Sequence, residues 1–582
     1  MSLHSILRHE LASIVDSPAA PSTTVPTNVA SRTSQEALNH PIDYGEPPLP
    51  LPAAPTPEEI QRVFDVAPLN VANKRRRITI TVLIVACNLM QMICNLIGIG
   101  GGIIISQKLG VSGAHVNWIG ASYPLTQGTF VLVSGRIGAV YGHKNMLLLG
   151  SAFLIIFTLA CGFCNNFVTF NVMRAMSGIG GAFIMPNAVA MIGITNPPGF
   201  ARNLSLGFFG ASGPIGGYIG ALILGGFIES APLVWMFAFI AAISLIIASL
   251  LWALLPREIP VDRYGRIDWI GSFLALGGLI VFNIMWNQAP AVGWSNPVVI
   301  ATLIISVTLF VGYYFWEHYF ATDPIMPLSI FKAPSFTPLI FVVLFTIMAA
   351  GILLWYTVLW QQDVRHWTPM QFALGWTPFG ICGGLGTFLA AYLIPRVSAQ
   401  WILAIGASCM LVATLLIATM PEQQPYWYQV FPSTILSSFS PDLTYTAAQI
   451  IASNAVSRKQ QGIAGSLIGS LLLYGTSLGL GFASTVESEV GKQHGKVAGY
   501  RGAMYFAVGL CVAALILDIC FVRLVHDNRE GWEDPADADP ADEVAAPVVT
   551  GTEIRADPVN EVVAPVVTGT ELRELRPQLE QR

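Results

Sequence analysis

The sequence is poor in charged residues, and this absence decides its broad class. Only 11% of its 582 residues are Asp, Glu, Lys or Arg, whereas soluble domains carry roughly 25%. Hydrophobic residues make up 53%, and the mean hydropathy is +0.60. These values exclude a soluble globular domain and predict a protein that crosses a lipid bilayer many times. Nucleic acid is not an expected partner.

Motifs of catalysis and cofactor binding are missing as well. The sequence has no G-x-x-x-x-G-K-[ST] loop to bind ATP, which disfavours transport driven by ATP hydrolysis in this chain. The eight cysteines all fall in apolar runs, and we expect the lone C-x-x-C pair, Cys161 and Cys164, to serve packing. No His, Cys and acid set has metal-ligand spacing. We therefore expect no enzyme activity, no metal and no cofactor.

The two ends of the chain differ from its middle. Residues 1–73 are rich in Pro, Ser, Thr and acids without a sustained apolar period, so we predict a disordered tail. No apolar core lies near Met1, and we expect no cleavable signal peptide. Residues 526–582 are acidic and contain an 18-residue repeat, with EVAAPVVTGTEIR at 543–555 and EVVAPVVTGTELR at 561–573. We predict a second flexible tail there.

Between the tails, fourteen apolar runs are long enough to cross a hydrocarbon core, for which about 20 residues suffice. They lie at 78–105, 116–134, 146–165, 167–190, 204–227, 233–255, 268–288, 298–318, 338–360, 371–394, 401–420, 427–452, 462–486 and 502–523. The division between the third and fourth runs rests on Asn165 and Asn166. The predicted fold class is all-α, with 14 transmembrane helices.

Lys and Arg predict how the runs thread through the membrane. If the chain enters from the cytoplasm, the inner segments hold sixteen of these residues, beginning with the run Lys74 to Arg77, and the outer loops hold five. Positive residues favour the cytoplasmic side. We therefore predict that both termini are cytoplasmic, in a plasma membrane or a vacuolar membrane.

One apolar run carries glycine at an unusual density, in the stretch GASGPIGGYIG at 210–220. A helix in lipid can hold these glycines, because its backbone groups must pair internally, and small residues let a neighbouring helix approach closely. Pro214 cannot donate to the helical hydrogen bonds, so we expect a bend there. The stretch predicts a packing seam between helices.

Two charged residues inside the runs are candidate sites. Asp442 follows Pro441 and is the only acid near mid-depth, where an ionised carboxylate is costly, so it is a candidate to take up and release a proton. An Asp held by a fixed hydrogen-bond partner is the alternative. Arg174 lies about seven residues inside its run, where a charge costs roughly 2.5–3.5 kcal/mol. It either serves function, as a second candidate residue for proton coupling, or extends toward the membrane surface.

Polar residues of the first run share one helix face. Asn88, Gln91 and Asn95 recur at spacings of three and four, and Gln127 in the second run is an expected neighbour. Together they are candidates to line a cavity.

Two further acids lie toward the ends of runs. We expect Glu487 to cap the outer end of its run, where it could collect protons, and Asp518 to form an ion pair with Arg523.

Five stretches resemble the fourteen-spanner drug:proton antiporters of the major facilitator superfamily, in particular a fungal aminotriazole- and boron-resistance-like branch. The order G-x-x-G-P-x-G-G resembles the antiporter signature of the fifth helix; it comprises Gly210, Gly213, Pro214, Gly216 and Gly217. The stretch RAMSGIGG, which begins at Arg174, resembles the family motif built on a membrane-embedded arginine.

The loop after the second run, SGRIGAVYGHK at 134–144, resembles the cytoplasmic loop motif of the superfamily. Gly135, Gly142 and Lys144 are in register, and Arg136 lies beside them. The family usually has Asp where this chain has Ala139, and with that Asp the loop forms a charge latch against a neighbouring helix end. A basic turn that orients two helices is the local alternative.

The remaining matches concern domain organisation. Residues 257–294 look like the extra helix pair of fourteen-spanners, and SPDLTY at 440–445 is similar to the C-terminal half of the fungal branch. The resemblance implies six-helix bundles at 74–255 and 338–525, joined by the extra pair and its linkers at 256–337. The pair is expected to contact lipid and to carry no substrate chemistry.

The resemblance implies a monomeric secondary transporter whose partners are a small-molecule substrate, protons and the lipid bilayer. Export of small organic or toxic compounds, or of a secondary metabolite, in exchange for protons is the expected activity. Uptake or facilitated passage of a small polar solute such as ammonium or borate is the first alternative. A nutrient sensor on the same scaffold, without transport, is the second.

Overall fold

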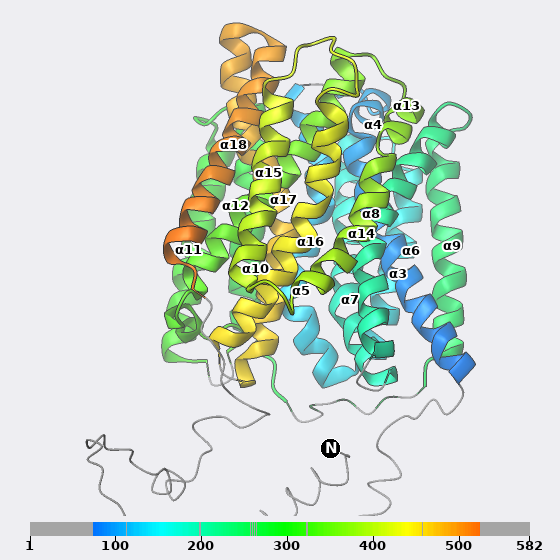
Figure 1. Cartoon of the computed structure of the whole chain (residues 1–582), viewed down its shortest axis with the longest axis vertical. Helices are drawn as coiled ribbons and strands as arrows, with labels where there is room; N and C mark the ends of the chain where they lie inside the picture. The colour runs from blue at the N-terminus through cyan, green and yellow to red at the C-terminus, as the bar shows by residue number, and fades with distance from the viewer. Residues whose placement is uncertain are drawn as a thin grey trace, which may run out of the picture. The chain divides into compact units, whose positions relative to one another are not determined.

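In the computed structural model, every regular element among the described residues is a helix (Figure 1). The description covers residues 74–523 apart from 112, 197–199, 257, 259, 261, 263–264, 322–323 and 457. The predicted tails at 1–73 and 526–582, with the repeat, lie outside these residues, as do Arg257 and Arg263 of the basic linker.

Each predicted apolar run overlaps a long helix. These helices are α3 (Lys74–Gly100), α5 (Asn117–Tyr141), α6 (His143–Gly162), α7 (Phe167–Thr195), α8 (Phe200–Ile228), α9 (Leu233–Leu254), α10 (Trp269–Val292), α11 (Pro297–Tyr319), α12 (Phe336–Leu359), the pair α13 (Pro369–Gly375) and α14 (Thr377–Leu393), α15 (Ala399–Ala418), α16 (Val430–Ala455), α17 (Arg458–His494) and α18 (Lys496–Phe521). Shorter elements are α4 (Gly102–Lys108), the 3-10 turns η1 (Gly113–Val116) and η2 (Leu328–Lys332), and the π-helical turn η3 (Trp360–Val364).

Among the described residues, twelve spans are long and apolar enough to cross a membrane. Helices α5 and α16, of 25 and 26 residues, are long enough but are not among the twelve. Both are rich in Ser and Thr, which lowers their hydropathy. The all-α membrane fold is confirmed, whereas the count of fourteen crossings stays a prediction.

Local chemistry explains where two predicted boundaries fall. Asn166 has an extended backbone, and its side chain accepts from the backbone N–H of Val168 (2.8 Å) and of Thr169 (3.3 Å), so it caps α7 and separates it from α6. Thr368 and Gln371 form a reciprocal capping box at the start of α13. Helix α8, in contrast, continues through Pro214 without interruption.

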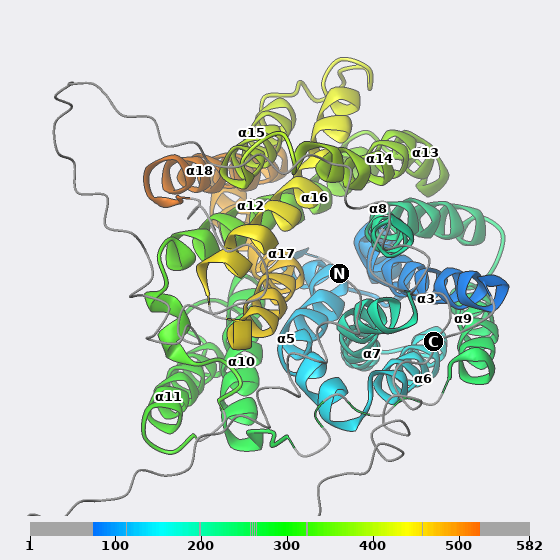
Figure 2. The ribbon, with the colours of Figure 1, turned by 60° about the horizontal axis from the view of Figure 1, so that its bottom comes forward.

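The long helices gather in two groups, as the view in Figure 2 shows. In the first group α3 packs on α8, α5 and α6 on α7, and α9 on α6. In the second group α12 packs on α17 and α18, and α15 and α14 pack on α16. The groups join mainly through α5 with α17 and α8 with α14, and also through α8 with α13 and α3 with α12. We call the end of the molecule at which α3 begins the Lys74 end, and the opposite end the Glu487 end.

Helix α10 is bound to both groups by polar contacts. Ser477 on α17 donates to Asn283 Oδ1 (2.9 Å), and Asn287 Nδ2 donates to the Ser477 carbonyl (3.3 Å). On the other side, Trp118 of α5 donates to Gln288 Oε1 (3.1 Å). Helix α11 packs on α10 and exposes apolar side chains. The exposed apolar face of α11 therefore fits the expected lipid contact. Helix α10, in contrast, also makes polar contacts with α5 and α17.

Candidate functional site

The glycines of α8 let it lie close to α3. A Cβ built on Gly216 would stand 2.8 Å from the Leu89 carbonyl oxygen, and one on Gly217 would stand 2.9 Å from Leu96 Cγ. Both contacts are closer than real Cβ atoms make, so any side chain here would force α3 and α8 apart. The predicted packing seam therefore exists between α8 and α3.

The same stretch meets α14 on its other side. Gly383 of α14 lies directly against Pro214, and a Cβ on Gly210 would stand 2.9 Å from Thr387 Cγ2. Gly213, in contrast, has open space around its Cα. Helix α8 thus lies between α3 and α14, and most but not all of its signature glycines are required by close packing.

Asp442 lies on α16, which packs on α14. It is half-buried on α16, twelve residues after Val430 and thirteen before Ala455, which is the middle of that helix. A Cβ on Gly386 of α14 would stand 3.2 Å from Asp442 Oδ2, so the carboxylate faces α14. Because Gly386 and Thr387 are consecutive, α14 contacts Asp442 on one side and the α8 stretch on the other.

Three of the four predicted amide residues form one buried network. Gln91 Nε2 donates to Asn88 Oδ1 (2.7 Å), and Gln127 donates to Gln91 Oε1. Asn88 Nδ2 in turn donates to Ser212 Oγ on α8 (2.7 Å). The network joins α3, α5 and α8, and its amides are at most 3% exposed. They bond to one another, although Gln127 Oε1 has no hydrogen-bond partner, and none lines either of the cavities described below.

Asn95, the fourth amide, stands apart from this network. Its side chain is 7% exposed, and its Oδ1 has no hydrogen-bond partner.

Arg174 is buried and bonded to backbone carbonyls. Its Nε donates to Ile119 (3.1 Å), its Nη1 to Cys94 (3.2 Å) and its Nη2 to Asn95 (3.4 Å). The side chain is 2% exposed, so it does not extend toward a surface. The guanidinium therefore holds α7, α3 and α5 together, which uses its planar arrangement of donors.

At the Lys74 end, acids of the α9–α10 linker bind the loop motif. Arg136 Nη1 pairs with Asp262 Oδ2 at 2.7 Å, and the Asp262 backbone N–H donates to the Ala139 carbonyl (3.0 Å). Glu258 accepts from the backbone N–H groups of His143 (3.2 Å) and Lys144 (2.8 Å), which begin α6. Although position 139 lacks the family's usual Asp, two acids from another segment bind the same loop.

The other loop residues have separate places. Lys144 Nζ donates to the Leu255 carbonyl (2.5 Å). Gly142 has a φ of +97°, a conformation that glycine adopts readily, where α5 ends and α6 begins. Gly135 lines a cavity of about 940 Å³ at this end, together with Arg136, Arg266 and residues of α7 and α17.

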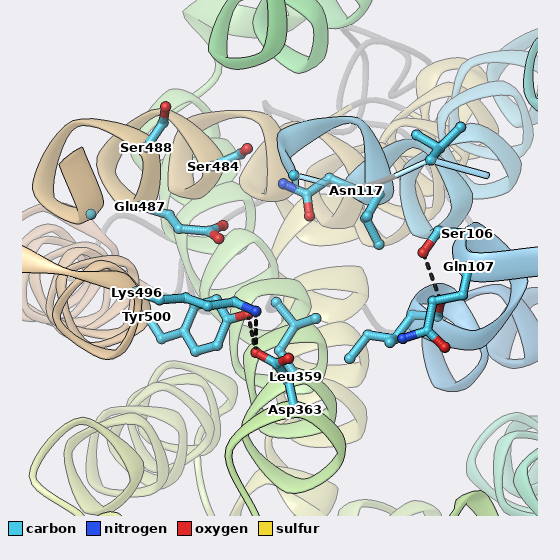
Figure 3. A pocket seen from close by; sticks show the side chains of 15 residues that line it. Ser106, Gln107, Asn117, Leu359, Asp363, Ser484, Glu487, Ser488, Lys496 and Tyr500 are labelled. Atoms are coloured by element: carbon cyan, nitrogen blue, oxygen red, sulfur yellow. Dashed lines mark hydrogen bonds and ion pairs between the residues drawn. The ribbon is translucent and has the colours of Figure 1, made fainter. Parts of the chain in front are cut away.

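A smaller cavity of about 400 Å³ lies at the Glu487 end (Figure 3). Tyr356 donates to Glu487 Oε2 (2.7 Å), Tyr500 donates to Asp363 Oδ2 (2.9 Å), and Lys496 Nζ pairs with the same oxygen at 2.5 Å. Apart from Glu487, sequence reasoning missed these residues. A signal was present in the sequence: the acid Asp363 lies between the predicted runs 338–360 and 371–394, three residues after the end of the first.

Two expectations about acids are wrong. Glu487 does not cap the end of its helix, because α17 continues to His494. Asp518 does not pair with Arg523: the Asp518 side chain is buried and both its oxygens lack a hydrogen-bond partner, whereas Arg523 Nη1 donates to the Ile519 carbonyl.

A family model described as the Major Facilitator Superfamily matches residues 81–421 and 339–569. The helix arrangement and this match define a multi-pass membrane transporter rather than an enzyme. The chain belongs to the major facilitator superfamily.

Curated relatives point to the fungal branch that the motifs resemble. The aminotriazole resistance protein of Saccharomyces cerevisiae is 34% identical over 425 residues, 71% of this chain and 78% of that protein. The low affinity ammonium transporter of the same yeast is 32% identical, over 70% of this chain and 81% of that protein. Efflux pump terJ of Aspergillus terreus is 32% identical over 475 residues, 78% of this chain and 89% of that protein.

Proposed function

We propose that the protein exports a small organic or toxic compound in exchange for protons. The observation that carries this proposal is the contact of consecutive α14 residues with Asp442 on α16 and with Gly210 on α8. A carboxylate at the middle of a membrane helix is costly when ionised and inexpensive when protonated. Its protonation therefore changes the forces on α14. Helix α14 packs directly on α8, at the boundary between the two helix groups.

In this mechanism the groups at 74–255 and 338–525 rock against each other around a central substrate site. Proton loss from Asp442 draws polar groups or water toward α16, and α14 shifts with it. Because Pro214 and Gly383 are in close contact, a shift of α14 displaces α8. Arg174 and the amide network keep α3, α5 and α7 together during this movement.

The Lys74 end is assigned to the cytoplasm, with both chain termini on that side. The support is the run of basic residues from Lys74 to Arg77, together with Arg136 and Lys144 at the same end. A monomer in the plasma membrane or the vacuolar membrane suffices for this mechanism.

Export is favoured by the similarity to two relatives, an efflux pump and an aminotriazole resistance protein. A second candidate function is passage of a small polar solute, which the similarity to a low affinity ammonium transporter favours. The two are distinguished by whether an imposed pH gradient drives aminotriazole uphill.

Purified protein in liposomes, with aminotriazole as the probe and a proton gradient imposed, tests the proposal. Wild-type protein is expected to accumulate aminotriazole against its gradient, whereas Asp442→Asn exchanges it only downhill. Asp442→Glu retains part of the coupling, because it keeps a titratable carboxyl group. Asp518→Asn is the matched control, since it removes another acid from the same helix group and is expected to leave coupling intact.

Uphill transport by Asp442→Asn at the wild-type ratio of protons to aminotriazole would refute the role of Asp442. If the wild-type protein passed aminotriazole only downhill, at a rate independent of the pH gradient, the second candidate function would instead be favoured.

A further inference from the structure

The cavity at the Glu487 end has the dimensions of a ligand site. Its volume of about 400 Å³ lies between α4 and α5 on one side and α12, α17 and α18 on the other. Figure 3 shows Glu487, Lys496 and Asp363 on one side of this space and Ser106 and Gln107 opposite them. Sites for small molecules have volumes of about 300–1,000 Å³. The cavity therefore accommodates a small organic compound.

The two carboxylates of the cavity are in different electrostatic situations. Asp363 is neutralised by Lys496, and it also accepts from Tyr500. Glu487 accepts a hydrogen bond from Tyr356, which is a neutral donor. A half-buried carboxylate is stabilised most by a cation at hydrogen-bond distance. Glu487 thus faces the cavity as a carboxyl group without a bonded cation.

Buried polar groups beside Glu487 also lack partners. Asn117 is 3% exposed and Ser484 is 1% exposed, and both line the cavity. Neither Asn117 Nδ2 nor Ser484 Oγ has a hydrogen-bond partner among the described residues. Most buried polar atoms in folded proteins are hydrogen-bonded, so these two atoms are available to bond a polar group in the cavity.

Part of the remaining wall is apolar, formed by Ile103, Val111, Val116 and Leu359, and Ser106, Gln107 and Ser488 add polar side chains to it. A ligand that matches the whole cavity has a charged or polar end toward Glu487 and an apolar body against the apolar side chains. An inorganic cation matches only the first half of this description.

We propose that this cavity binds small amphipathic organic cations that carry a protonated amine, and that Glu487 is the residue that binds the ammonium group. The site is separate from Asp442, and binding here does not depend on proton exchange. Lys496 places a like charge on the same wall and weakens binding. Asn117 and Ser484 contact polar atoms near the ammonium.

Phenethylamine and phenylethanol are the probes, because they share an aromatic body and differ in the charged group. Calorimetric titration of the full-length protein in lipid nanodiscs at neutral pH, without a gradient, measures binding directly. The wild-type protein is expected to bind phenethylamine about tenfold or more tightly than phenylethanol, in line with a charge-assisted hydrogen bond. Glu487→Gln is expected to abolish this preference.

Two further variants control the result. Glu489→Gln removes an exposed acid from the same helix, one that pairs with Lys492, and is expected to bind like the wild type. Lys496→Gln removes a like charge and also leaves the Asp363 carboxylate without its cation, so it is expected to bind phenethylamine several-fold more tightly and phenylethanol unchanged. This opposite sign tests the site without altering Glu487, even if Glu487→Gln fails to fold.

Equal binding of the amine and the alcohol by wild-type protein would overturn the inference, as would weaker amine binding by Lys496→Gln. Since no gradient is present, these outcomes say nothing about Asp442. If wild-type protein did not transport aminotriazole in response to a proton gradient but still bound phenethylamine more tightly than phenylethanol, only the proposed function would be refuted.

Discussion

The two helix groups differ in the kind of polar residue that they contain. From Lys74 to Leu254 the sequence has a single acid, Glu229, whereas residues 336–521 contain six, among them Asp442 and Glu487. The first group buries amides that bond to one another and an arginine that bonds to carbonyls. The second group places carboxylates beside a cavity or a glycine face.

This difference separates two tasks. A network of neutral amides that bond to one another has no charge to gain or lose, so the first group offers a scaffold of hydrogen bonds that do not titrate. Carboxylates in the second group can change charge, and the helices that carry them can respond. The proton-dependent step of the proposed mechanism therefore belongs to α14 and α16.

The largest effect is expected at Arg174. Replacing it by Ala leaves three buried carbonyls without their donor, and each buried acceptor that loses its partner costs about 1–3 kcal/mol. Arg174→Lys has one nitrogen in place of three and is expected to lose nearly as much. Thermal unfolding of detergent-extracted protein measures the loss, and the exposed Arg396→Lys is the control. A wild-type unfolding temperature for Arg174→Lys would show that charge alone suffices.

An intermediate effect is expected in α8, where one face packs within the first group and the other against the second. Gly216→Ala pushes on the α3 backbone, and overpacking of this kind costs about 1–3 kcal/mol. Gly210→Ala pushes on Thr387 of α14, so it should slow transport more than it lowers stability.

Paired measurement of unfolding temperature and aminotriazole uptake separates these two outcomes. Gly213→Ala, which has open space for its methyl group, is expected to match the wild type in both. If Gly210→Ala and Gly216→Ala changed stability and uptake in the same proportion, the two faces of α8 would not have different tasks.

The smallest effect is expected at the loop of the first group that lacks its own acid. The Arg136 and Asp262 side chains are 38% and 42% exposed, and such pairs contribute about 0.2–1 kcal/mol. Asp262→Asn should therefore lower the transport rate by at most about fivefold. Adding Ala139→Asp places an acid three residues after Arg136 on the same helix, so the double variant should recover.

Initial rates of aminotriazole uptake in liposomes check this prediction. If Ala139→Asp did not restore activity to Asp262→Asn, the linker acid would have a task that an acid within α5 cannot fulfil.

Local signals predicted much of the fold. Asn166 marked the division between α6 and α7 because a capping side chain acts on its own neighbours. The glycines of α8 predicted a close helix contact, since only small residues permit one. Asp442 was found because a mid-helix acid is rare enough to stand out in composition.

The parts that sequence reasoning missed depend on distant segments. Asp262 and Glu258 lie in a linker whose path no periodicity describes, yet they bind the loop at Arg136. Asp363 and Lys496 belong to different helices and meet only through tertiary packing. Charge and hydropathy locate such residues along the chain but not relative to one another.

The position of α10 has a consequence for compounds that dissolve in the bilayer. It packs on both α5 and α17, with Trp118 bonded to Gln288 on one side and Tyr474 bonded to the Leu279 carbonyl on the other. Lipid-borne molecules approaching this boundary meet α10, with α11 packed on it, before they reach α5 or α17. Lateral entry from the hydrocarbon phase is therefore obstructed on this flank, and at the other boundary between the groups α8 and α14 pack directly on each other.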